Sequence, residues 1–153
     1  MLSEALRVLR PSGLILLGEW IYPPVHSSTS ISPPGMTAFC QALDESLLSV
    51  YAIPKIPLYL TEFITRLGGF DDIQSRDYHM PIGEHLIDLG VNFGDTLKVW
   101  TESAVIVLKR AGYDEDEVIR LVDGFIGDIS NVPGLQVAYR VVTARRATGK
   151  TPV

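Results

Sequence analysis

The sequence predicts an α/β fold, and three observations support it. An unbroken apolar run at residues 14–20 and an alternating run at residues 135–143 are typical of strands. A third stretch, at about residues 73–80, also has the pattern of a strand. Between these runs, apolar residues recur at the three- and four-residue spacing of amphipathic helices. Strands and helices that alternate along a chain indicate an α/β sheet.

The first predicted elements are a helix, a turn and a strand. Residues 1–9 place their leucines on one helical face, and Pro11, Ser12 and Gly13 then break the helix. We expect Gly13 to take the special backbone conformation of this sharp reversal. Residues 14–20 follow without polar alternation, which predicts a strand buried on both faces, as in a parallel sheet. Residues 22–35 hold four prolines and five serines or threonines, so we expect a loop there.

Two helices are predicted next, before the strand at about residues 73–80. Apolar side chains at helical spacing predict one helix over residues 36–51, and Pro54 and Pro57 separate it from the next. The second helix has its stripe at residues 60–67 and ends at Gly68 and Gly69, with Phe70 placed to pack against it.

The last third of the chain predicts two helices and a final strand. Residues 97–111 form one stripe, and Gly112 stops that helix. Asp114 and Glu117 have the spacing of a capping box, which begins an amphipathic helix that runs to residue 129. These acidic residues could instead be proposed as a metal cluster, but capping explains them with fewer assumptions. The alternating residues 135–143 complete the predicted sheet.

Composition and charge exclude several classes of protein. The formal charge of −5 argues against nucleic-acid binding, which needs clustered Lys and Arg. No apolar run is long enough to cross a membrane. Cys40, the sole cysteine, allows no intrachain disulfide and has the spacing of a packed core thiol, so we expect a cytoplasmic location. We interpret the basic cluster near the C-terminus as a solvated strand end and tail; it comprises Arg140, Arg145, Arg146 and Lys150.

Local motifs do not identify a reaction. The sequence contains no glycine-rich nucleotide-binding loop. His26, His79 and His85 lack the spacing and the partner cysteines of a metal site, so we expect no metal. No residue is assigned as catalytic on this basis.

Residues 4–19 resemble a recurring segment of class I S-adenosylmethionine-dependent methyltransferases. The stretch R-V-L-R-P-S-G at residues 7–13 is similar to the end of the helix and the turn that precede the fifth strand in that family. Ser12 stands where the family has the first glycine of the turn.

Further segments extend the resemblance over nearly the whole chain, in the family's order. Residues 67–73 (L-G-G-F-D-D-I) are similar to the junction between the next helix and the sixth strand. Residues 80–83 (M-P-I-G) and 89–90 (L-G) resemble a stretch of the fungal methyltransferases of secondary metabolism. Residues 139–146 (Y-R-V-V-T-A-R-R) resemble the family's final antiparallel strand.

The resemblance implies a partial Rossmann-like sheet made of the last three strands, the final one antiparallel. Residues 1–147 would be the C-terminal part of a methyltransferase domain, with helices inserted at about 36–56 and 84–130, and residues 148–153 a flexible tail. In the family the cofactor is S-adenosylmethionine and the acceptor a small molecule. The groups that bind the cofactor lie upstream of the matched region, so we expect this chain, a truncated product or gene model, to bind none by itself.

Four residues are the candidates for the substrate side of the pocket. Glu19, Trp20 and Tyr22 follow the first strand, near the carboxyl edge where α/β proteins bind ligands. Trp100 lies in an inserted helix and could contribute to a lid. Trp20 and Tyr22 could instead be packing residues under the inserted helices, and Glu19 a structural hydrogen-bond acceptor rather than a base. The alternative function is a non-catalytic interaction module that pairs, or self-associates, through an open strand edge.

Overall fold

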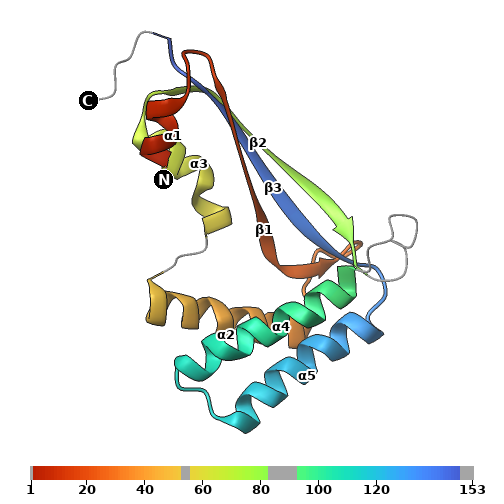
Figure 1. The fold of residues 1–153 in the computed structure, drawn as a ribbon. Coiled ribbons are helices and arrows are strands. Elements are labelled where there is room, and N and C mark those ends of the chain that lie inside the picture. The colour runs from red at the N-terminus through yellow and green to blue at the C-terminus, as the bar shows by residue number, and fades with distance from the viewer. Residues whose placement is uncertain (1, 53–55, 83–92, 149–153) are drawn as a thin grey trace. The chain divides into compact units, whose positions relative to one another are not determined.

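The computed structural model describes residues 2–52, 56–82 and 93–148 and confirms the α/β class (Figure 1). Helices and strands follow one another along the chain in the order α1 (Leu2–Val8), β1 (Leu14–His26), α2 (Pro34–Tyr51), α3 (Ile56–Leu67), β2 (Phe70–Pro81), α4 (Phe93–Arg110), α5 (Glu115–Asn131) and β3 (Leu135–Arg146). Residues 149–153, the predicted tail, lie outside the described residues, as do His85 and the L-G pair at 89–90.

The three strands form one sheet in the order β1-β3-β2. Arg146 N donates to Gly13 O (2.8 Å), and Ser27 N donates to Gly134 O (2.9 Å). The end of β3 therefore pairs with the start of β1, and its start with the end of β1. Corresponding bonds join β3 to β2 with the same polarity. The last strand is thus central and antiparallel to both neighbours, which confirms the expected orientation of the final strand.

The chain divides into two compact units, and each strand contributes to both. Unit 1 comprises residues 1–21, 55–78 and 139–153, and unit 2 comprises residues 22–54 and 79–138. Most of the two predicted insertions falls in unit 2.

The core of unit 1 lies between its two helices and one face of its strands. Leu6 of α1 and Ile64 of α3 pack with Val142 and Ala144 of β3, and Phe70 joins them just after the two glycines that end α3. Partly buried residues complete this cluster: Leu2, Leu9, Ile15, Leu17 and Ile73. Gly68 and Gly69 have φ of 70° and 74°, the left-handed conformation expected of a glycine cap.

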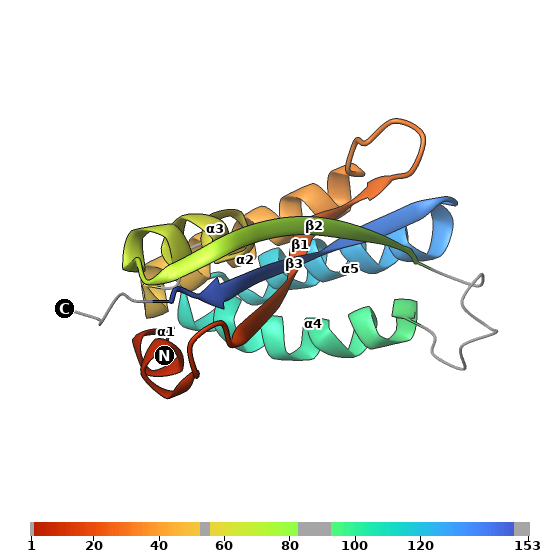
Figure 2. The same cartoon turned by 90° about the horizontal axis from the view of Figure 1, so that it is seen from above.

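Unit 2 is dominated by α2, α4 and α5, which lie side by side (Figure 2). Gly35 of α2 and Gly124 of α5 meet so closely that a Cβ on Gly35 would overlap the Gly124 carbonyl. At the same crossing, Asp128 of α5 accepts a hydrogen bond from Met36 N (2.8 Å). Since Pro33, the residue before α2, provides no side-chain cap, a carboxylate 92 residues away satisfies this first-turn amide.

The predicted capping box of α5 is present. Asp114 accepts from Glu117 N (2.8 Å), and Glu117 accepts from Asp114 N (3.1 Å). Both acidic side chains therefore satisfy backbone donors that the first helical turn leaves open.

Three expectations about β1 were wrong. The strand is not buried on both faces as in a parallel sheet: it lies at the edge, antiparallel to β3, and Leu14 and Leu16 are 52% and 61% exposed. The strand continues to His26, although residues 22–35 read as a loop, because an edge strand tolerates prolines that a central strand cannot. In the preceding turn, the residue with positive φ is Ser12 (61°) and not Gly13. Gly13 is needed for a different reason: a Cβ there would lie 2.7 Å from the Arg10 carbonyl oxygen.

Candidate functional site

The four candidate residues are divided between the two units. Glu19 and Trp20 belong to unit 1, and Tyr22 and Trp100 belong to unit 2. Successive residues of a strand point to opposite faces of the sheet, so Glu19 and Trp20 do not share a face. The structure brings Tyr22 and Trp100 together.

Tyr22 stacks on Trp100 in an aromatic cluster of unit 2. The ring centroids are 5.1 Å apart, and the ring planes differ by 6°. Trp100 also meets Phe39 of α2 edge-on at 5.8 Å and lies 6.1 Å from Phe125 of α5. Both phenylalanines are fully buried and 4.6 Å from each other, so Trp100 joins the packed core of the three helices to the end of β1.

Trp20 packs edge-on against Tyr139 of β3, with the ring centroids 4.7 Å apart. The Tyr139 ring also lies over Gly18, where an added Cβ would overlap the phenol group. A glycine in the middle of a strand is a known sign of such a close approach. Gly18 therefore leaves room for the Tyr139 ring, and the sequence alone does not reveal this contact.

Glu19 has a local hydrogen bond of its own. Its carboxylate accepts from the amide of Trp20 (3.1 Å), which is the structural acceptor role weighed against that of a base.

Arg140 forms a bidentate pair with Asp77 that sequence reasoning missed. Its Nε and Nη2 donate to the two carboxylate oxygens of Asp77 at 2.7 and 2.8 Å. The side chains are 25% and 32% exposed. The hydrogen bonds that Arg140 donates to Asp77 raise the pKa of Arg140, so the guanidinium stays charged. Sixty-three residues separate the two, and only the pairing of β2 with β3 brings them together.

Two further members of the predicted basic cluster, Arg145 and Arg146, also make contacts at the strand end, and Lys150 lies outside the described residues. Arg146 donates to the carbonyl of Leu9, and Arg145 donates to the carbonyl of Ser12 (3.3 Å). Arg145 also lies 3.7 Å from Asp72. Arg145 is 52% exposed, in agreement with a solvated strand end, and these contacts attach it to the turn before β1 and to β2.

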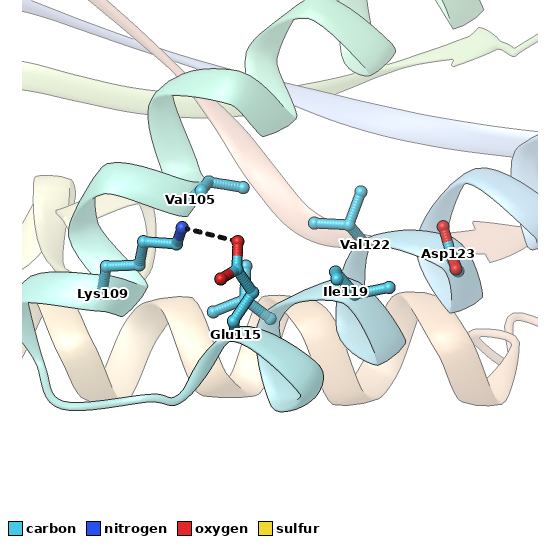
Figure 3. Close-up of a pocket in the computed structure, with 7 residues that line it drawn as sticks. Val105, Lys109, Glu115, Ile119, Val122 and Asp123 are labelled. Carbon is cyan, nitrogen blue, oxygen red and sulfur yellow. Dashed lines mark hydrogen bonds and ion pairs between the residues drawn. The ribbon is translucent and has the colours of Figure 1, made fainter.

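A shallow groove lies between α4 and α5 (Figure 3). Its volume is about 200 Å³, and its walls are mainly aliphatic: Val105, Val118, Ile119 and Val122. At one end Lys109 approaches Glu115 at 3.4 Å. Clefts that bind ligands usually hold about 300–1,000 Å³, so this groove is below the size of a cofactor site.

The histidines form no metal centre in the described part of the chain. His26 Nδ1 accepts from Ser28 N (3.2 Å) and lies 2.9 Å from the Ser28 hydroxyl, which is a local turn contact. Within residues 2–52, 56–82 and 93–148, no three His, Cys, Asp or Glu side chains gather where they could hold a metal ion.

The comparisons with known proteins give no further identification. No family model matches the chain, and no curated protein matches it. Among the described residues, every helix is too short or too polar to span a membrane.

Proposed function

We propose that this chain is the C-terminal part of a class I S-adenosylmethionine-dependent methyltransferase that acts on a small molecule. The observation that carries the proposal is the strand order β1-β3-β2, with β3 antiparallel to both neighbours. The resemblance in sequence implies a final strand that is antiparallel, and β3 has that orientation. β1 and β2 would then be the fifth and sixth strands of the family's sheet, and β3 its last.

The turn before β1 supports the same assignment. The family has a glycine where this chain has Ser12, and Ser12 is the residue with φ of 61°. A glycine takes positive φ without strain, whereas a serine does so at a cost. The positive φ at position 12 thus explains why the family has a glycine there.

We expect the cofactor-binding groups to lie outside the described residues. Two observations support this: no strand among these residues is followed by a glycine-rich loop, and the groove between α4 and α5 is smaller than usual ligand clefts. We therefore infer that the chain does not bind S-adenosylmethionine by itself, and we derive no chemical step through it.

In the complete enzyme, residues of this chain would contribute to the acceptor side. Tyr22 and Trp100 would offer a rigid aromatic surface, which orients a flat or apolar acceptor by stacking. Catalysis of methyl transfer rests largely on such positioning and on the exclusion of water.

Two experiments test this proposal. Sequencing of the transcript should reveal, upstream and in frame, a strand followed by a glycine-rich loop; an upstream sequence without one contradicts the proposal. Calorimetry of the full chain with S-adenosylmethionine should show no binding, and micromolar affinity would contradict the inference that the cofactor site lies elsewhere.

A second candidate is a non-catalytic interaction module, and the exposed edge of β1 favours it. Leu14 and Leu16 are 52% and 61% exposed there. If the transcript encodes no cofactor-binding segment, this candidate accounts better for the apolar edge.

A further inference from the structure

The free edge of β1 is an unfilled hydrogen-bonding surface in unit 1. Among the described residues β1 pairs with β3 alone, so about every second residue of the strand turns its N–H and C=O away from the sheet. Ile15 and Leu17 face the core of unit 1, whereas Leu14 and Leu16 lie on the opposite face and are exposed. The edge thus combines open backbone groups with an apolar row of side chains.

Nothing in the segment protects this edge. Residues 14–18 contain no charged residue and no proline, and those are the usual devices that prevent strands of different chains from pairing. An uncharged aliphatic segment of this kind is suited to bind another strand.

We propose that the free edge of β1 binds β1 of a second copy of this chain in antiparallel pairing. The segment complements itself under two-fold symmetry. With Ile15 opposite Ile15 of the second copy, Leu14 of each copy lies opposite Leu16 of the other, and aliphatic cross-strand pairs of this kind stabilise sheets.

The charges that flank the segment favour the same orientation. Arg10 precedes it and Glu19 follows it, with opposite signs. Antiparallel pairing brings the Arg10 end of each copy to the Glu19 end of the other, so attraction acts twice. Parallel pairing would bring like charges together. This charge pattern is the reason to choose a second copy as the occupant. The proposal rests on the interaction-module candidate, because in a methyltransferase sheet a further strand would cover this edge.

Sedimentation of the full chain tests the pairing. The mass should rise with concentration from 16.8 kDa to twice that value. Leu16→Lys should raise the dissociation constant more than tenfold, because a charge would then lie inside the paired apolar row. Val99→Lys is the matched control: Val99 is 63% exposed, close to the 61% of Leu16, but it belongs to α4 in unit 2 and not to β1. Circular dichroism verifies that both variants fold.

The proposal is overturned if the wild-type chain stays monomeric at all concentrations, or if the two lysine variants weaken association equally. Disulfide cross-linking tests the register independently. Chains with Leu14→Cys should cross-link to chains with Leu16→Cys when mixed under oxidation, and neither should cross-link to itself. The wild-type chain, whose Cys40 is buried, is the negative control. Absence of a disulfide in the mixture contradicts the proposed register.

Discussion

The two edges of the sheet are built from different residues. β1 presents an uncharged segment at residues 14–18, with two leucines exposed on one face. β2, at the opposite edge, is exposed along most of its length and carries Asp71, Asp72, Arg76 and Asp77. Charges on an edge strand discourage pairing with other chains, so the composition of β2 suits an edge exposed to solvent. β1 is composed to be covered, whether by further strands of a methyltransferase sheet or by a second copy.

The largest expected effect concerns Gly18 of β1, over which the Tyr139 ring lies. Gly18→Ala should lower the free energy of unfolding by about 1–3 kcal/mol, because the added methyl group overlaps the phenol ring. Urea denaturation measures this. Gly127→Ala in α5 is the control: no atom lies within 4 Å of its added Cβ, and the same substitution should stabilise that helix by about 0.5–1 kcal/mol.

A double variant identifies the cause of the Gly18 effect. If the ring overlap is responsible, Gly18→Ala should cost much less in a Tyr139→Ala background than in the wild type. An equal cost in both backgrounds would show that the strand backbone, and not the tyrosine, requires glycine.

A lysine introduced into each edge strand in turn tests the comparison directly. Leu16→Lys on β1 should weaken self-association more than tenfold, about 1.4 kcal/mol. Tyr78→Lys on β2, where the native side chain is 50% exposed, should leave association unchanged. Light scattering over a concentration series measures both, and equal losses would mean that the two edges do not differ.

The third effect concerns the charged pair that β2 makes with β3. Asp77→Asn should destabilise the chain by about 1 kcal/mol, a value reduced by the partial exposure of both side chains. Glu4→Gln removes the fully exposed pair of Glu4 with Arg7 and should change the melting temperature little. Because the pKa of Arg140 is raised, the stabilisation from its charge is present at neutral pH and is lost only as the pH rises through the raised pKa, in strongly alkaline solution.

The smallest effect compares two positions near the starts of the two edge strands. Ser12, before β1, and Asp72, in β2, have positive φ of 61° and 52°. Ser12→Gly should stabilise the chain by about 0.5–1 kcal/mol, because glycine takes this conformation without strain.

Asp72→Gly should stabilise the chain less than Ser12→Gly does, or should destabilise it. Aspartate tolerates the left-handed region better than serine, and Asp72 also accepts a hydrogen bond from Gln74 (2.8 Å). Thermal melting of both variants measures the difference. A larger gain at position 72 than at position 12 would contradict this ranking.

The sequence predicted the features of this molecule that depend on neighbours in the chain. The stripes of the helices, the capping box at Asp114 and the burial of Cys40 follow from spacing alone, and the structure has them. β1 was predicted too short, because Pro23 and Pro24 exclude a central strand but not an edge strand, and the edge position is a property of the whole sheet.

Contacts between distant residues could not be predicted from one sequence. Arg140 and Asp77 carry no local signal of their pairing, and neither Gly18 nor Tyr139 indicates the other. For the candidate site, the sequence placed Tyr22 and Trp100 in one group, and the structure stacks them. Their role toward a substrate stays a prediction.

Amide hydrogen exchange at low and high chain concentration tests the difference between the edges most directly. The peptide that covers residues 14–18 should exchange more slowly as the concentration rises, because pairing protects amides that the monomer leaves open. The peptide that covers residues 71–78 should exchange at the same rate throughout. Unchanged exchange in the first peptide, or equal protection of both, would contradict the account that β1, and not β2, is built to be covered.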